Sequence, residues 1–197
     1  MSSRRRAPGF TLIEAMIVVA IVGVLAVLAT VGYRRWTRGT YVAEAQDMLG
    51  NIRTAENSFF AENGGYLNVT GSAASPQRGA GNSYPATNPG AFVSDWGGPC
   101  AACTGNPNAW QQLGVQASGP VHFGYSCIAG DGVKVPASVI GAPTVNGVAL
   151  GYASIQTPVQ PWYFVEADAN LSGDGTTFTH LYAMSGSNKI WVDGEGN

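Results

Sequence analysis

A long apolar run near the N-terminus sets the first limit on how this chain can fold. Between Ala15 and Ala29 there is no polar side chain. The wider stretch Phe10–Val31 has 22 residues, and as an α-helix it would extend for roughly 33 Å, which is enough to cross a hydrocarbon core about 30 Å thick. We therefore expect residues 10–32 to form a membrane-spanning helix.

Two other kinds of segment could carry such a run. A secretory signal peptide has a shorter apolar region, about 7–15 residues, and a small-residue cleavage site after it. Here the run is longer and is followed by Arg34, Arg35 and Trp36. A buried core helix is the other alternative, but soluble folds seldom contain a helix that is apolar on all sides. The membrane span is the better interpretation.

The rest of the chain is weakly charged and rich in turn-forming residues. Charged residues make up 11% of the sequence, glycine occurs 27 times, and the net charge is -2. Three arginines on each side of the span leave its orientation undecided by the positive-inside rule. The glycine-rich, cysteine-containing remainder favours a loop-rich β domain outside the cytoplasm, and the lack of basic character disfavours binding to nucleic acid.

One carboxylate, Glu14, stands at the entrance of the apolar run. A charged side chain inside a span costs about 2.5–3.5 kcal/mol on insertion scales and is usually functional where it occurs. Glu14 could simply be hydrated at the membrane interface. Alternatively it awaits a cationic partner, and a new α-amino group made by cutting the chain just upstream would supply one.

The segment GFTLIEAMIVVAIVGVLA resembles the N-terminus of type IV prepilins and of type II secretion pseudopilins. The family pattern is a short basic leader ending in glycine, then an aromatic residue, a glutamate four residues further on, and an apolar helix. Gly9, Phe10 and Glu14 match it. The resemblance implies that residues 1–9 are a leader, that prepilin peptidase cuts after Gly9 and methylates the Phe10 amine, and that Glu14 pairs with the Phe10 amine of a neighbouring subunit.

The resemblance also implies a function. The chain would be a structural subunit of a type IV pilus-like filament, inserted once in the inner membrane with its C-terminal head outside the cytoplasm. A pilus assembly platform would polymerise it through the N-terminal helix into a surface filament. The alternatives are a pseudopilin of a periplasmic pseudopilus, a minor pilin acting as a tip adhesin or DNA-binding module, and a membrane-tethered enzyme. Many type IV pilins have a proline late in the span, whereas this chain has Gly32 there.

Beyond the span the helical pattern continues to about residue 62. No proline occurs between Tyr33 and Glu62, and Gly64 and Gly65 form a stop signal. The apolar residues of this part recur at helical spacing and form one stripe, interrupted at Glu56. Its members are Val42, Ala45, Leu49, Ile52 and Phe59. We expect a single spine helix over residues 10–62 whose second half packs on a head domain.

Residues 63–197 are expected to form that globular, loop-rich head. Strand-like runs occur at residues 121–129, 162–168, 176–184 and 189–192, and turn sequences separate the last three, which predicts an antiparallel meander. The fold class is therefore α+β, with a long helix packed on a C-terminal antiparallel sheet.

Three cysteines, Cys100, Cys103 and Cys127, offer two kinds of site. Thr104 stands where a haem-attachment motif needs histidine, and the glycine- and proline-rich surroundings disfavour a thioredoxin-like site. With His122 the three thiols could form a Cys₃His zinc site. We favour a disulfide between Cys127 and one of the other two, because the head is expected in an oxidising space.

The stretch DANLSGDG resembles the first half of an EF-hand loop. Its oxygen-bearing side chains stand at alternate positions, with Gly173 at the turn, but the twelfth position is Thr179 instead of a bidentate glutamate. The four candidate calcium ligands are Asp168, Asn170, Ser172 and Asp174. A polar hairpin turn is the other interpretation.

Enzyme chemistry finds little support in the sequence. The two histidines, His122 and His180, lie in strand-like runs, and neither a nucleophile elbow nor a phosphate-binding loop occurs. The head's tryptophans could bind a surface or stack on DNA bases. With so few basic residues near them, we interpret them as core and subunit-packing residues and expect no catalytic site.

Overall fold

The computed structural model describes most of the chain after residue 9. The predicted leader, residues 1–9, lies outside the described residues. The described residues are 10–72, 75–76, 82–85, 90, 92–103, 106–132, 144–150 and 160–194. The elements are α1 (Leu12–Asn63), β1 (Gly71–Ser72), β2 (Ser75–Pro76), α2 (Ala109–Gln112), β3 (Gly124–Gly130), β4 (Thr144–Val145), β5 (Val148–Ala149), β6 (Trp162–Ala169), β7 (Thr179–Met184) and β8 (Trp191–Asp193). Residues 1–38 and 39–197 form two compact units.

Helix α1 has 52 residues and agrees with the predicted spine helix to within two residues at each end. It ends where the sequence indicated, because Gly64 adopts φ 74°, a conformation that favours glycine, and donates its N–H to the Phe60 carbonyl at 2.8 Å. A left-handed residue just after the last turn is the usual way to satisfy a terminal carbonyl.

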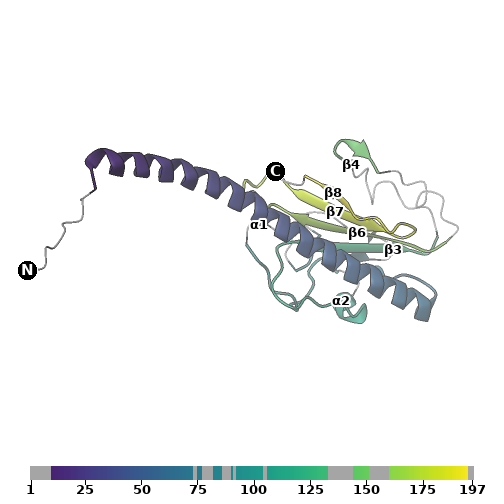
Figure 1. Cartoon of the computed structure of the whole chain (residues 1–197). Helices are drawn as coiled ribbons and strands as arrows, with labels where there is room; N and C mark the ends of the chain where they lie inside the picture. The colour runs from purple at the N-terminus through teal and green to yellow at the C-terminus, as the bar shows by residue number, and fades with distance from the viewer. Residues whose placement is uncertain are drawn as a thin grey trace, which may run out of the picture. The chain divides into compact units, whose positions relative to one another are not determined.

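Four antiparallel strands form the sheet of the head, in the order β3-β6-β7-β8 (Figure 1). The α+β class and the C-terminal meander are thus confirmed. Three strands start later than predicted, and one of them is β8, which begins at Trp191 instead of Lys189. β3 begins at Gly124, although Val121 still pairs with Ser94 through an isolated bridge, and β7 begins at Thr179, after an irregular stretch that follows the turn.

The main core lies between the sheet and the second half of α1. The buried helix residues follow the predicted stripe. Glu56, where the stripe was predicted to be interrupted, is itself fully buried. The buried residues of α1 are Val42, Ala45, Met48, Leu49, Ile52 and Glu56. Arg53, beside them, ties the helix to the β7–β8 turn by donating to the Asn188 carbonyl and to Asn188 Oδ1, at 3.0 and 2.8 Å.

Strand β6 is buried along its whole length because both faces of the sheet are covered. Alternate side chains of a strand point to opposite faces. Tyr163 and Val165 therefore join the core beneath α1, whereas Trp162 and Phe164 join a second, smaller cluster. The next two residues on that second face, Glu166 and Asp168, are acidic. Two carboxyl groups are therefore buried at the end of an otherwise apolar strand.

The outer edge of β3 is occupied by loop backbone. Val69 and Thr70 donate their N–H groups to the Cys127 carbonyl at 3.0 and 2.9 Å. Tyr84 pairs with Tyr125 through an antiparallel bridge. An open strand edge is a site of unwanted pairing, and here the segments between α1 and β3 cover it.

Candidate functional site

The predicted assembly segment begins with two exposed residues and a helix cap. Phe10 is 81% exposed. The hydroxyl oxygen of Thr11 accepts the N–H of Glu14 at 3.2 Å, and the Thr11 carbonyl accepts the N–H of Ala15. Thr11 therefore caps the helix, and Glu14 lies in the first turn, where the helix dipole favours a negative charge. Gly9 lies outside the described residues.

This cap was missed in the sequence, although the signal is present. Threonine followed three residues later by glutamate, just before an apolar run, is the pattern of a capping box. Because the backbone N–H of Glu14 makes the bond, the start of the helix does not depend on the glutamate side chain. The carboxylate remains available for another partner.

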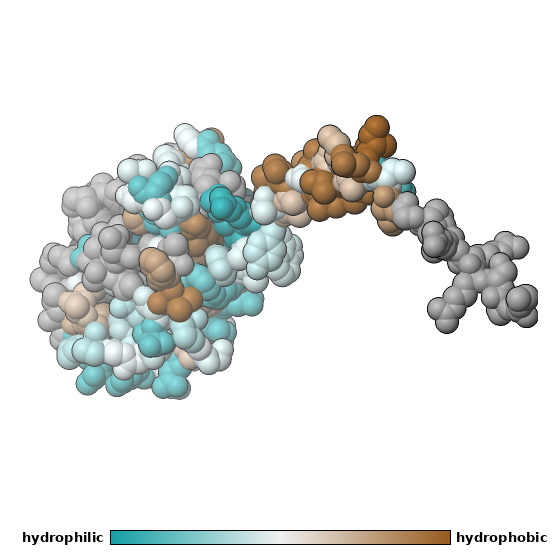
Figure 2. Space-filling model, turned by 90° about the vertical axis from the view of Figure 1, so that its left-hand side faces the viewer, coloured by the Kyte–Doolittle hydropathy of each residue, from teal (hydrophilic) through white to brown (hydrophobic). Residues whose placement is uncertain are grey.

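The first half of α1 presents apolar side chains on every side. Large apolar residues between Leu12 and Val31 are about half to four-fifths exposed, and by length and composition this part could cross a membrane. Figure 2 shows hydrophobic residues over the visible face of this segment. A helix that is apolar all round needs lipid or other apolar helices around it. This surface is the largest exposed apolar feature of the described chain.

A disulfide is present as predicted, but the predicted pairing of Cys127 was wrong. Cys100 and Cys103 form a disulfide with each other, and Cys127 is a free, fully buried thiol. Two residues three positions apart in a tight turn meet without help from the rest of the fold, whereas Cys127 lies in the central part of β3 on the helix side. The disulfide also removes two of the four ligands proposed for zinc, so the Cys₃His site is not formed.

Cys127 faces the buried Glu56 across the core. The thiol lies 3.2 Å from Glu56 Oε1, and Oε2 of the same carboxyl accepts the Leu67 N–H at 2.9 Å. Burial raises the pKa of Glu56 to about 7, against the opposing effect of these hydrogen bonds. Burial, together with the nearby Glu56, raises the pKa of the Cys127 thiol. Below about pH 7 the Glu56 carboxyl therefore keeps its proton in the folded chain.

A second polar cluster lies on the other face of the sheet. The Nδ1 atom of His180 is 2.5 Å from Asp168 Oδ1 and 3.5 Å from Glu166 Oε1. Burial alone would lower the pKa of His180, but its bonds to the two carboxylates raise it to about 10. Burial and the neighbouring Glu166 raise the pKa of Asp168 to about 6, although His180 opposes the shift.

These three side chains are the described group best placed to hold a metal ion, since their possible ligand atoms lie within 4.8 Å of one another. They could do so only if His180 released its proton, because the nitrogen that faces the carboxylates would have to carry a free lone pair. In the structure the histidine itself neutralises part of the buried acidic charge.

Three of the four predicted calcium ligands lie in the hairpin turn between β6 and β7. Asn170 Oδ1 accepts the Gly173 N–H at 2.7 Å and the Ser172 hydroxyl at 3.1 Å. Asp174 accepts the Thr177 hydroxyl at 2.5 Å, and hydrogen bonds from Thr177 and its neighbour lower the pKa of this exposed acid. Asp168 belongs to the His180 cluster instead. The polar-turn interpretation describes this arrangement, and calcium binding stays a prediction.

The other histidine joins a loop to the spine helix. His122 Nδ1 lies 2.9 Å from Glu44 Oε2, its backbone N–H donates to Oε1 of the same carboxylate at 2.9 Å, and its ring stacks on Tyr41 at 3.6 Å. A histidine bound in this way fixes the segment before β3 against α1. We interpret its role as structural.

Comparison with known proteins finds a family-model match and several similar proteins. Residues 4–30 match the model of the prokaryotic N-terminal methylation motif. The type IV major pilin protein PilA of Myxococcus xanthus is 40% identical over 72 residues, which cover 36% of this chain and 33% of PilA. No solved structure matches the chain.

Two further relatives give the same pattern. A fimbrial protein of Pseudomonas aeruginosa is 46% identical over 54 residues, 27% of this chain and 35% of that protein. The type IV major pilin protein PilE1 of Neisseria gonorrhoeae is 39% identical over 70 residues, 34% of this chain and 42% of that protein. The alignments thus span about a third to two-fifths of these relatives. Together with the motif match over residues 4–30, they confirm the resemblance to type IV pilins.

Proposed function

We propose that this chain, part of which is similar to type IV major pilins, is the structural subunit of a type IV pilus-like filament. The observation that carries the proposal is the methylation motif over residues 4–30, continuous with a helix that is apolar on all sides. A helix of this kind is suited first to a lipid bilayer and then to the shared core of a helical filament, because both surround it with apolar groups.

The proposed sequence of events follows from that helix. The chain is inserted once in the inner membrane with its head outside the cytoplasm. Prepilin peptidase removes residues 1–9 and methylates the Phe10 amine. An assembly platform then adds the subunit to the filament, and the charged amine of Phe10 pairs with Glu14 of a neighbouring copy. This pairing neutralises two charges that apolar surroundings would otherwise make costly.

The processing step gives the direct test. Intact-mass analysis and N-terminal sequencing of the protein purified from its cell surface should find N-methylated phenylalanine, Phe10, as the first residue. The same chain recovered from cells that lack prepilin peptidase should keep residues 1–9. A mature chain that starts elsewhere in the apolar run would show that the segment is an ordinary signal peptide.

Abundance in the filament decides between the main proposal and its close alternatives. Mass spectrometry of sheared filaments, combined with electron microscopy, should find this chain as the bulk species. A trace amount would indicate a minor pilin, and a chain retained in the periplasmic space without surface filaments would indicate a pseudopilin. The relatives reported above include major pilins, which favours the first outcome.

A further inference from the structure

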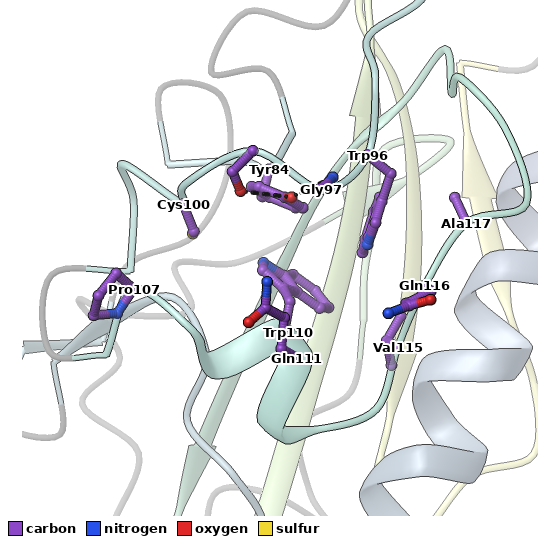
Figure 3. Close-up of a pocket in the computed structure, with 11 residues that line it drawn as sticks. Tyr84, Trp96, Gly97, Cys100, Pro107, Trp110, Gln111, Val115, Gln116 and Ala117 are labelled. Carbon is purple, nitrogen blue, oxygen red and sulfur yellow. Dashed lines mark hydrogen bonds between the residues drawn. The ribbon is translucent and has the colours of Figure 1, made fainter.

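We propose that the head binds a neutral sugar ring in the aromatic cavity between Trp96 and Trp110. This site is separate from the assembly helix and does not depend on the proposed function. The cavity has a volume of about 180 Å³ and lies among the loops that precede β3 (Figure 3). Its size and its lining chemistry both limit what it can accept.

Aromatic rings form the main walls of the cavity. The Trp96 ring contacts Tyr84 and Trp110 edge to face, with centroid distances of 4.8 and 5.4 Å, and Tyr84 and Trp110 are stacked at 5.9 Å. Figure 3 shows the three rings grouped around the same space. Aromatic faces offer large rigid apolar contacts with little loss of conformational entropy. The C–H face of a pyranose ring is a matching partner for the half-buried Trp96 ring, which packs against the buried rings of Tyr84 and Trp110.

One residue of the cavity wall also carries an unpaired hydrogen-bond donor. The Nε1 atom of Trp110 is buried and finds no hydrogen-bond partner among the residues that the structure describes, and the residue is only 3% exposed. In Figure 3 this nitrogen lies at the end of the ring nearer Cys100. Buried donors are normally paired, and one that is not costs free energy. A ligand hydroxyl or ring oxygen would accept this hydrogen.

The polar groups at the rim are amides and not charges. The side chains of Gln111 and Gln116 are exposed and line the cavity, and each offers both donors and an acceptor. The lining residues that the structure describes include no acidic, basic or histidine side chain. A phosphate, a carboxylate or a cation would therefore lack a counter-charge here. Neutral hydroxyl groups fit the amides and the indole N–H equally well.

The cavity is already held in shape without a ligand. The Tyr84 hydroxyl accepts the Gly97 N–H at 2.8 Å and donates to the Gly98 carbonyl at 2.9 Å, which fixes the loop that carries Trp96. The Cys100–Cys103 disulfide closes the adjacent turn. Preorganised sites lose less free energy on binding, since little has to be ordered. The cavity is smaller than the ~300–1,000 Å³ of typical small-molecule sites, so it suits one ring.

The test is a titration of the full chain in a zwitterionic detergent that has no sugar headgroup. With ¹⁵N-labelled tryptophan, each of the five indole N–H groups gives its own resonance. Glucose, galactose, mannose, N-acetylglucosamine and N-acetylgalactosamine are the probes. We expect at least one to shift the Trp110 resonance saturably, with half-saturation in the millimolar range, as for a ligand of few atoms.

Trp162 serves as the internal control. Its Nε1 is also buried without a described partner, but it lies in the cluster on the other face of the sheet, outside the cavity. Its resonance should stay in place. Glycerol should leave both resonances unchanged. No saturable shift with any of the sugars, or equal shifts at Trp110 and Trp162, would overturn the proposal.

Two variants locate the binding. Trp110→Phe keeps an aromatic ring but removes the donor, so we expect at least tenfold weaker binding. Gln111→Ala removes one exposed rim amide, so we expect several-fold weaker binding. Both are measured at the Trp96 resonance. Gln160→Ala changes an exposed glutamine outside the cavity and should bind as the parent does. If Trp110→Phe does not fold, Gln111→Ala decides. Unchanged half-saturation in the folded cavity variants would refute the site.

Discussion

At the level of single residues, Glu56 is an ionisable side chain that the fold places in an apolar environment. The helix pattern places it on the apolar stripe, and the structure buries it there completely. Its folded-state pKa of about 7 lies above the usual 4.5. Between these two pKa values the Glu56 carboxyl is therefore protonated in the folded chain and ionised in the unfolded chain. Because the folded state binds the extra proton, the free energy of unfolding falls as pH rises from about 4.5 to about 7.

Glu56→Gln should remove this part of the pH dependence. Glutamine can still accept the Leu67 N–H, but it cannot ionise. Relative to the parent, the variant should gain up to about 3 kcal/mol between pH 4.5 and pH 7, from the size of the shift. Urea unfolding at several pH values measures the difference. Asp168 titrates in both proteins, so its contribution cancels from the difference. If the free energies of unfolding of the two proteins change in parallel between pH 4.5 and pH 7, Glu56 is not protonated when buried.

Two other residues show where sequence reasoning succeeded and where it stopped. Glu14 could be identified because its spacing from Gly9 and Phe10 is a pattern shared with known proteins. The pairing of Cys103 could not, because Cys100 is near it in any fold but excluding Cys127 requires knowing where the tertiary fold places that thiol. The partners of Glu56 have the same origin, since Leu67 and Cys127 approach it only after the sheet packs on the helix.

At the level of elements, the β3–β6 pair contains a close approach between a glycine and an indole ring. Gly130 is opposite Trp162 in the ladder, and a Cβ atom at Gly130 would lie 2.6–2.7 Å from atoms of that indole ring. The indole is itself buried, so it has little room to move. The register of the two strands therefore requires glycine at this position.

Gly130→Ala should destabilise the head by about 1–3 kcal/mol, the usual cost of inserting a methyl group into a packed site. Gly119→Ala is the matched control, since a Cβ atom there meets nothing within 4 Å, and it should change stability by less than about 0.5 kcal/mol. Chemical unfolding of the two variants makes the comparison. Equal effects would mean that Trp162 moves aside without cost.

The β6–β7 turn permits a direct test of calcium binding. If the turn binds calcium, millimolar calcium should raise the melting temperature of the full chain above its value in EDTA, because the ion binds only the folded state. Asp174→Ala should abolish the difference. The Asp193→Ala variant, which changes an acid on β8 outside the turn, should keep it. The same melting temperature in both buffers would leave a polar turn held by its own hydrogen bonds.

Elements were predicted more accurately than contacts. The end of α1, the order of the last three strands and the turn at Gly173 all follow from local signals such as helix periodicity and glycine position. The late start of β7 does not, because residues 176–178 have strand-forming character but pair with no neighbouring strand. Loop segments that cover β3 were likewise unpredictable, since their backbone bonds join residues far apart in sequence.

At the level of the whole molecule, the proposed filament depends on one charge in an apolar helix. Glu14→Ala should insert in the membrane as well as the parent or better, because it removes a costly acid. The helix should still begin at the same place, since Thr11 caps it through backbone N–H groups. Surface filaments should be lost, because the Phe10 amine has no partner.

Membrane fractionation and electron microscopy of the same cells measure both effects. Glu62→Ala changes an exposed acid near the other end of the same helix and should form filaments normally. Abundant filaments with Glu14→Ala would show that the acid is not used for docking. Loss of the protein from the membrane fraction would show instead that Glu14 acts in insertion.

The disulfide has a mechanical consequence for such a fibre. A bond between Cys100 and Cys103, three residues apart, shortens one turn and cannot carry tension between distant parts of the head. A fibre under load would therefore rely on non-covalent contacts within the head, such as the strand ladders and the link from Arg53 to Asn188. Pulled in an optical trap, the head should yield at the same force with and without a reducing agent.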